Sequence, residues 1–146
     1  MSTGLPVFDT TVQESNHWLK IVESRLPPCD RRQAYGALRA VLHSLRDRLP
    51  LEGVLGLSAE LPMLLRGVLF EGWRPQQGAT DMHDMDAFAE TVKAQLPPQF
   101  PRQPNEAVEA VFAALGDRLD PGQTRKLVTY LPLPLRAAWP VEHRVG

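Results

Sequence analysis

Two arginines in this 146-residue sequence stand in apolar surroundings, where a positive charge could bind an anion. Arg66 is the one charged side chain of residues 61–70, and Arg136 is the one charged side chain of residues 131–139. A guanidinium group that leaves water needs carboxylate or carbonyl partners, because an unpaired buried charge is costly. We therefore predict that both arginines are partly buried, and that they either pair with an acid of the chain or line an anion site.

Asp47 and Asp117 are the acids that we expect to pair with these arginines. Each lies in an Asp-Arg-Leu motif, nineteen residues before its arginine, and the two motifs are seventy residues apart. The equal spacing predicts two Arg–Asp pairs, each of which joins the helix of the acid to the helix of the arginine. The pairs could form within one half of the chain or between the halves, and an anion site is the alternative.

Residues 81–86 contain three aspartates and His83, which are possible ligands of a divalent metal. Their spacing matches no known metal loop, and the glycine of a tight calcium turn is missing. Acidic residues are also favoured at helix N-termini, where the backbone carries partial positive charge. We expect a helix start here and no metal site.

Residues that could act as nucleophile or base are scattered. Cys29 has no histidine close in sequence, although a catalytic thiol needs a positioned base. There is no glycine-rich phosphate loop and no Gly-x-Ser-x-Gly motif. We expect no catalytic residues, no enzyme activity and no cofactor. The four histidines, none of which recurs seventy residues away, are His17, His43, His83 and His143.

Arg32, Arg39 and Arg46 are seven residues apart and would form a basic stripe along one helix. Such a stripe could contact nucleic-acid phosphates. Acids interleave with it, however, and the positions seventy residues after Arg39 and Arg46 are Glu109 and Gly116. A solvated helix face is the better interpretation, and a nucleic-acid partner is disfavoured.

The totals favour a protein of the cytoplasm. The formal net charge is −1, so no strongly charged partner is implied. One cysteine excludes an internal disulfide and suits a reducing compartment. The first nine residues do not resemble a signal peptide, and no apolar run reaches the roughly twenty residues of a membrane span. We expect no membrane association.

The elements that must position these side chains occur twice. Shifting the chain by seventy positions aligns residues 11–73 with the second half without gaps, and most of the matches are apolar residues or prolines. We predict one domain over residues 1–146, with repeat one at about 11–73 and repeat two at about 81–143. The matches include Val22 and Val92, Leu26-Pro27-Pro28 and Leu96-Pro97-Pro98, Arg32-Gln33 and Arg102-Gln103, Ala37 and Ala107, Val41 and Val111, Leu45 and Leu115, and Leu57 and Leu127.

The apolar residues recur at the helical period, and no segment alternates as a strand would. The fold class is therefore all-α, a helical bundle made of two pseudo-symmetric tandem repeats. Residues 1–8 are expected to be a loose arm. Expected helix starts include caps at Asp30, Asn105 and Asp120. The predicted helices cover about 11–26, 31–48, 51–59, 62–73, 81–96, 105–119, 121–131 and 132–139.

Trp73 and Trp139 end the last helix of each half at non-equivalent positions. Tryptophans at such positions plug the end of a core or anchor a partner. The segment 64–73 is so apolar that it requires either burial or self-association.

The motifs carry a family resemblance. Leu61-Pro62-Met63-Leu64-Leu65-Arg66-Gly67, Phe70-Glu71-Gly72-Trp73 and the Leu-Pro-x-x-Leu-Arg-x-x-Trp-Pro of residues 131–140 resemble a bacterial family known as domain of unknown function 2267. The resemblance covers nearly the whole chain. It implies a small, all-helical cytoplasmic protein and no particular activity.

Two functions remain open from the sequence. The first is a non-enzymatic interaction or scaffold module that binds an unknown protein partner or associates with itself. The second is binding of a small ligand or anion in a cleft between the two repeats. A deep pocket between the repeats lined by Arg66 or Arg136 would favour the second function, and a flat exposed apolar patch would favour the first.

Overall fold

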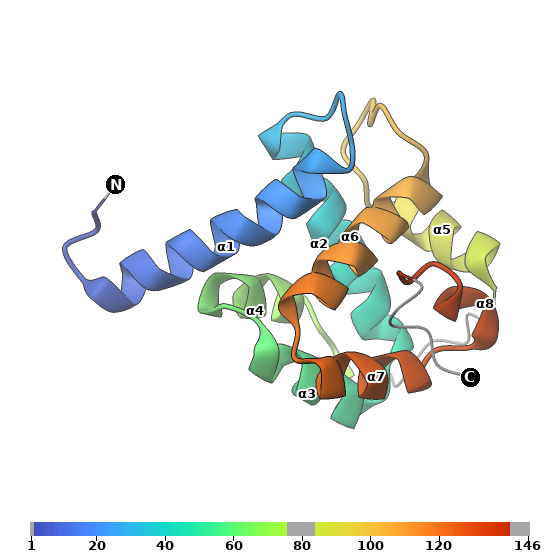
Figure 1. The fold of residues 1–146 in the computed structure, drawn as a ribbon. Helices are drawn as coiled ribbons and strands as arrows, with labels where there is room; N and C mark the ends of the chain where they lie inside the picture. Colours follow the sequence, from blue (N-terminus) through green and yellow to red (C-terminus); the bar gives the residue numbers. More distant parts are fainter. Residues whose placement is uncertain (1, 76–83, 141–146) are drawn as a thin grey trace.

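The computed structural model describes residues 2–75 and 84–140 (Figure 1). This part of the chain is helical and contains no strand, which confirms the all-α prediction. Its helices are α1 (Pro6–Ser24), α2 (Arg31–Arg48), α3 (Leu51–Glu60), α4 (Met63–Phe70), α5 (Met85–Lys93), α6 (Pro104–Arg118), α7 (Pro121–Thr129) and α8 (Leu133–Arg136).

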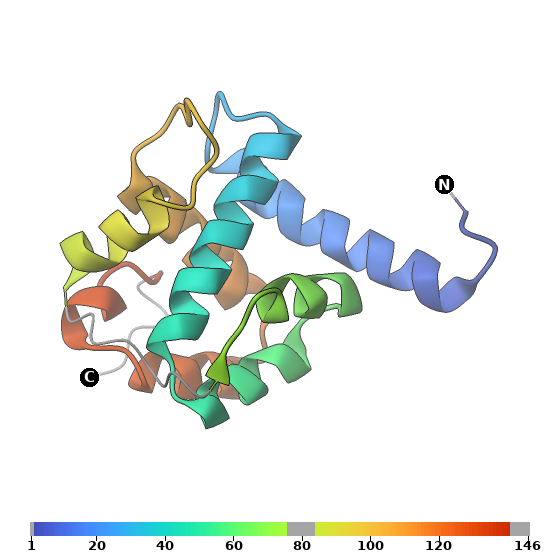
Figure 2. The same cartoon turned by 180° about the vertical axis from the view of Figure 1, so that it is seen from behind.

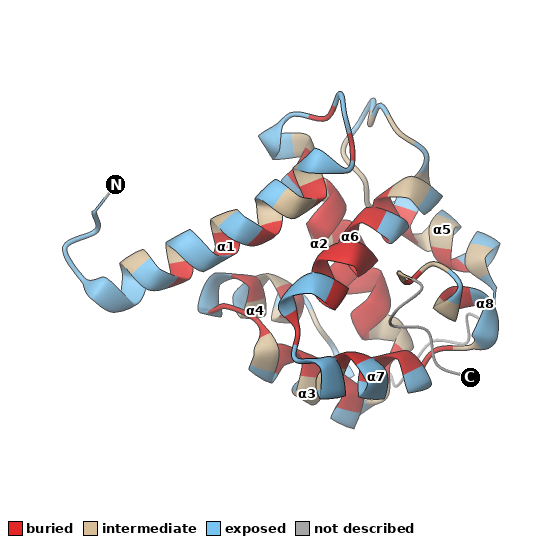
Figure 3. Ribbon diagram, viewed as in Figure 1, coloured by how far each residue is buried: buried red, intermediate tan, exposed pale blue. Residues whose placement is uncertain are grey.

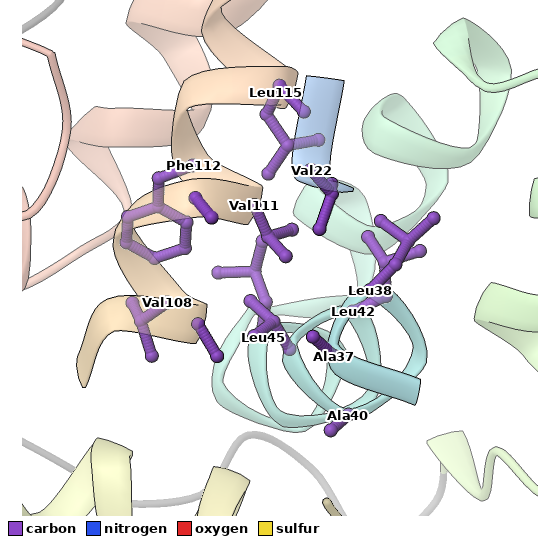
Figure 4. Packing of buried hydrophobic residues seen from close by; sticks show 14 of the residues in the cluster. Val22, Ala37, Leu38, Ala40, Leu42, Leu45, Val108, Val111, Phe112 and Leu115 are labelled. Atoms are coloured by element: carbon purple, nitrogen blue, oxygen red, sulfur yellow. The ribbon is translucent and has the colours of Figure 1, made fainter. Parts of the chain in front are cut away.

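Helices α2 and α6 form the centre of the molecule and pack against each other (Figure 1). Every residue from 40 to 46 of α2 and from 110 to 116 of α6 is buried. Helix α1 packs on both central helices, and so does α5. Figure 4 shows Leu42 and Leu45 of α2 beside Val111 of α6 and Val22 of α1, in one continuous apolar cluster.

The helix starts follow local capping chemistry. The Asp30 carboxylate accepts from the Gln33 backbone N–H at 2.8 Å, while Gln33 Oε1 accepts from the Asp30 N–H at 2.9 Å. Asp120 accepts from the Gly122 N–H at 3.1 Å, at the start of α7. Both predicted caps are confirmed. The predicted cap at Asn105 is wrong, because α6 begins at Pro104 behind a capping box of Gln103 and Glu106.

Helix α1 begins at Pro6, so the prediction of a loose arm over residues 1–8 is wrong in its last three residues. Proline is preorganised for the first helical position, since its φ is already helical and it has no N–H to satisfy. Asp9 follows in the first turn and accepts from the Thr3 N–H at 2.6 Å. The first turns of α1 consequently project beyond the rest of the molecule (Figures 1 and 2).

Helices α4, α5 and α8 each end three residues before the predicted position. Helix α4 ends at Phe70, and Gly72 two residues later has a φ of 71°, which only glycine adopts readily. Helix α8 ends at Arg136, after which Ala138 and Trp139 donate to carbonyls three residues back, at 3.2 and 3.1 Å. These tighter turns take the place of the last predicted turn of α-helix.

Replacing Gly36 by alanine should destabilise the fold. A Cβ atom at this position of α2 would lie 2.3 Å from the Pro97 Cγ, so the loop after α5 would have to move. We expect the free energy of unfolding in urea to fall by about 1–3 kcal/mol, the usual cost of overpacking. Gly67→Ala is the control, because nothing lies within 4 Å of its Cβ position and alanine favours a helix. Equal stability of the two variants would contradict the close packing of α2 against Pro97.

Candidate functional site

Arg66 lies on α4 and is half-buried. Its Nε donates to the carbonyl oxygen of Ser58 at 2.8 Å, and its Nη2 donates to that of Leu61 at 3.2 Å. Both carbonyls belong to the end of α3, where the last turn of a helix has no backbone donors of its own. Arg66 therefore caps the C-terminus of α3, and its positive charge interacts favourably with the negative end of the helix dipole.

Arg136 has the same role at the end of α7. Its Nε donates to Leu131 O at 2.8 Å and its Nη2 to Thr129 O at 3.1 Å. In each case the arginine is the fourth residue of a short helix and reaches back to carbonyls at the end of the helix before it. The apolar surroundings of these guanidinium groups thus reflect a structural function.

The expected pair of Arg66 with Asp47 does not form. Asp47 accepts instead from Arg46 Nε at 2.9 Å, and within residues 2–75 and 84–140 the hydrogen bonds of Arg66 go to the carbonyls of Ser58 and Leu61. The carbonyls lie on the segment that directly precedes α4, so Arg66 reaches them without removing a second charge from water. Asp117 is exposed at the end of α6.

The predicted basic stripe of α2 is not a solvated face along its whole length. Arg46 is buried, and its Nη1 donates to the carbonyls of Leu69 at 2.9 Å and Glu71 at 2.8 Å. Arg39 Nε donates to the Glu71 carboxylate at 2.9 Å. Leu69 and Glu71 lie at the C-terminal end of α4, where carbonyls have no donor within the helix, so Arg46 supplies the donor that they need.

His43 completes this arrangement between Arg39 and Arg46. Its side chain is buried, and Nε2–H donates to the carbonyl oxygen of Val68 at 2.7 Å. Burial lowers the pKa of the imidazole, the hydrogen bond to Val68 opposes this, and the charges of Arg46 and Arg39 lower the pKa further. The folded state therefore favours the neutral form of the His43 imidazole.

The two tryptophans differ. Trp139 is 1% exposed and stacks on Phe112 with ring centroids 4.6 Å apart, so it packs in the core and presents no surface to a partner. Trp73 is half-buried and packs against Phe70 at 5.3 Å. Its remaining exposed part lies next to the end of α4.

The hollow that lies between the two halves at α3 and α7 is small. Helices α3 and α7 pack side by side, and the hollow between them is lined by side chains such as Gln123, Lys126 and Tyr130. Neither predicted arginine lines it. Arg66 lines a different hollow of about 300 Å³, between the first turns of α1 and the start of α4. Its other lining residues are Val7, Thr10, Thr11, Glu14, Leu61, Pro62 and Met63.

The two segments that border this second hollow carry exposed apolar side chains, of which Val7 and Met63 line the hollow itself. We call this surface the α1–α4 face and define it by five residues that are 45–53% exposed: Leu5, Val7, Phe8, Met63 and Leu64. The projecting turns of α1 that carry three of them are largely exposed in Figure 3. Thr11 Oγ1 accepts from the Leu64 N–H at 3.1 Å, which fixes α1 to the start of α4.

The α1–α4 face is missing from the sequence-based prediction because residues 1–8 were expected to be irregular. Two local signals point to the longer helix: Pro6 suits a first helical position, and Asp9 suits a first turn. The spacing of Val7, Thr11 and Ser15 also extends the inward-facing stripe of α1 by one turn.

The acidic segment before α5 begins outside the described residues, since Asp81 and His83 lie there. Asp84 is described, and its carboxylate caps α5 by accepting from the Ala87 N–H at 2.7 Å. Among residues 2–75 and 84–140, no group of three or more histidine, cysteine, aspartate or glutamate side chains could hold a metal ion. Within the same ranges no helix has the length and apolar character to cross a membrane.

Removing the Arg66 guanidinium should destabilise the protein without removing an ion pair. Arg66→Met keeps the length of the side chain but leaves the Ser58 and Leu61 carbonyls without this donor. We expect a loss of about 1–3 kcal/mol in the free energy of unfolding, the cost of an unsatisfied buried polar group. Arg125→Met, at an exposed position of α7, should change it little. A small effect at both positions would contradict the capping role of Arg66.

Stability should depend on pH through His43. Because its folded-state pKa is lowered, the unfolded state binds a proton that the folded state does not as the pH falls through the ordinary histidine range near about 6.5. The free energy of unfolding should therefore decrease from pH 7.5 to pH 5.5. His43→Gln should lose much of this dependence, whereas His17→Gln, at an exposed position, should keep it. An unchanged pH profile in His43→Gln would show that the burial of His43 does not control it.

Comparison with curated proteins finds no match to this chain. A family model does match: the family described as an uncharacterized conserved protein, DUF2267, aligns with residues 15–138. The aligned region includes both capping arginines and every helix from α2 to α8, together with the inner part of α1. Because the match extends over most of the chain, the protein belongs to the DUF2267 family.

Proposed function

We propose that this protein is a non-enzymatic interaction module of the cytoplasm, and that the α1–α4 face binds its protein partner. The observation that carries the proposal is the exposure of apolar side chains on a helix that projects from the body. Val7 and Phe8 are 45% and 53% exposed on the projecting turns of α1. Exposed apolar patches mark interaction sites in folded proteins.

The exposed side chains continue a stripe that is buried further along the same helix. Trp18, Ser15 and Thr11 of α1 are buried against the body, and Val7 is the next residue at a spacing of four. The first turns of α1 project beyond the body (Figures 1 and 3), and Val7 in these turns is 45% exposed. A partner placed there would extend the packing that the body provides for the rest of the helix.

The α1–α4 face is ordered before a partner binds. Helical backbone begins at Pro6, and the Thr11–Leu64 hydrogen bond joins α1 to α4. A surface held in its bound shape loses less conformational entropy on association than an irregular segment would. This ordering favours binding by the face as a preformed unit.

We further propose that the body consists of two pseudo-symmetric tandem repeats, at about 11–73 and 81–143. Matching helix ends support this: α2 and α6 end at Arg48 and Arg118, and α3 and α7 begin seventy residues apart. The two arginine caps of α3 and α7 are also seventy residues apart. Within the described residues α1 begins nine residues before the counterpart of the start of α5.

Binding of an anion or small ligand between the repeats has less support. Arg66 and Arg136 donate to backbone carbonyls, and the hollow between α3 and α7 does not include them. Cytoplasmic location is in keeping with the single cysteine, which is buried and free.

Photo-crosslinking can test whether the α1–α4 face binds a partner. A photoreactive phenylalanine analogue would replace Phe8 in the full chain, expressed at its native level in the cells of origin. We expect a discrete crosslinked product after irradiation, because the ring lies on the proposed contact surface. The matched control places the same analogue at Leu133, which is 65% exposed on α8. No product at Phe8, or equal crosslinking at both positions, would reject the proposal.

A further inference from the structure

We propose that the α1–α4 face binds a second copy of this chain, and that the two copies form a two-fold symmetric dimer. This inference rests on the proposed function, because it names the partner of the same surface. The inference rests on the shape and the charges of the α1–α4 face, and on the low net charge of the whole chain.

The α1–α4 face combines a projecting element with a hollow. The first turns of α1 carry Val7 and Phe8. Val7 itself borders the hollow, which Leu61, Pro62 and Met63 line from the side of α4. In a two-fold dimer the same patch is used on both copies, so the patch must be complementary to itself. The face meets this requirement by itself, since the α1 turns of one copy can lie in the hollow of the other.

The charges of the hollow are also complementary to themselves. Glu14 on α1 and Arg66 on α4 both line it. Within residues 2–75 and 84–140, Glu14 has no hydrogen bond or ion pair, and the Arg66 Nη1 donates to no acceptor. Under two-fold symmetry, Glu14 of each copy can therefore approach the free Nη1 of the other copy's Arg66. Each dimer would gain two such pairs, which favour this register over others.

An acidic or a basic partner would fit the hollow less well, because it would leave Glu14 or Arg66 facing a like charge. A second copy brings one of each. The formal net charge of −1 per chain also means that two copies repel each other little. The apolar side chains supply the attraction, and the two charges determine the orientation.

Sedimentation equilibrium of the full chain tests the dimer directly. Between about 1 µM and about 1 mM, a range that covers weak to moderate affinities, we expect the average mass to rise from 16.3 kDa toward twice that value. Phe8→Ser should raise the dissociation constant about tenfold or more, as loss of a buried aromatic anchor does. Leu133→Ser is the matched control and should leave the constant unchanged, because its side chain is exposed on another surface.

The charge arrangement has its own test. Glu14→Arg would place two arginines at each contact and should weaken the dimer more than Glu14→Gln does. Dimerisation of the original chain should weaken with added salt, and this dependence should be smaller in Glu14→Gln. Arg66 is left in place because it also caps α3. A monomer throughout the concentration range would overturn the inference, and so would equal effects of Phe8→Ser and Leu133→Ser.

The crosslinking experiment separates failure of this inference from failure of the proposed function. A product at twice the mass of the chain supports the second copy. A product of another mass, with the purified chain monomeric, overturns the dimer but leaves the α1–α4 face as a binding surface. Absence of any product at Phe8 rejects the function itself.

Discussion

Basic side chains that donate to carbonyl oxygens at helix ends join the short helices of this protein to the elements beside them. A short helix leaves a large share of its carbonyls without backbone donors, and α3, α4, α7 and α8 are all short. Arg66 and Arg136 satisfy the ends of α3 and α7, while Arg46 and His43 satisfy the end of α4. Each contact also joins two helices, so a local requirement for donors becomes a tertiary constraint. The planar, branched guanidinium suits this function, since it can reach two carbonyls at once.

This use of arginine changes how the charges of the chain should be interpreted. Arg66 and Arg136, which could indicate an anion site, donate to backbone oxygens instead, and so does Arg46 of the basic stripe. The surface that remains distinctive is apolar. It lies where α1 extends past α4, and the Thr11–Leu64 hydrogen bond holds it in place. The packed helices of the body and this hydrogen bond thus hold the projecting turns of α1 in position.

The projecting turns of α1 connect the fold with the proposed function, because this helix is longer than the surface on which it packs. The inward-facing stripe of α1 is longer than the surface it packs on, so Val7 and Phe8 stay in contact with water. Solvation of such side chains is unfavourable in proportion to their exposed apolar area. Binding by a second copy would cover them, and Glu14 and Arg66 would decide the orientation in which it docks.

The sequence by itself determined the local features: the all-α class, the caps at Asp30 and Asp120, and membership of the family. These depend on helical periodicity and on contacts a few residues apart, which neighbouring residues largely control. Tertiary structure decided the partner of Arg66 and the burial of Arg46, although both residues could be recognised as unusual. Tertiary structure also decided that the side chain of Val7 stays partly exposed to water. The reason is distance along the chain: which helix end comes to lie beside which side chain depends on how separate helices pack.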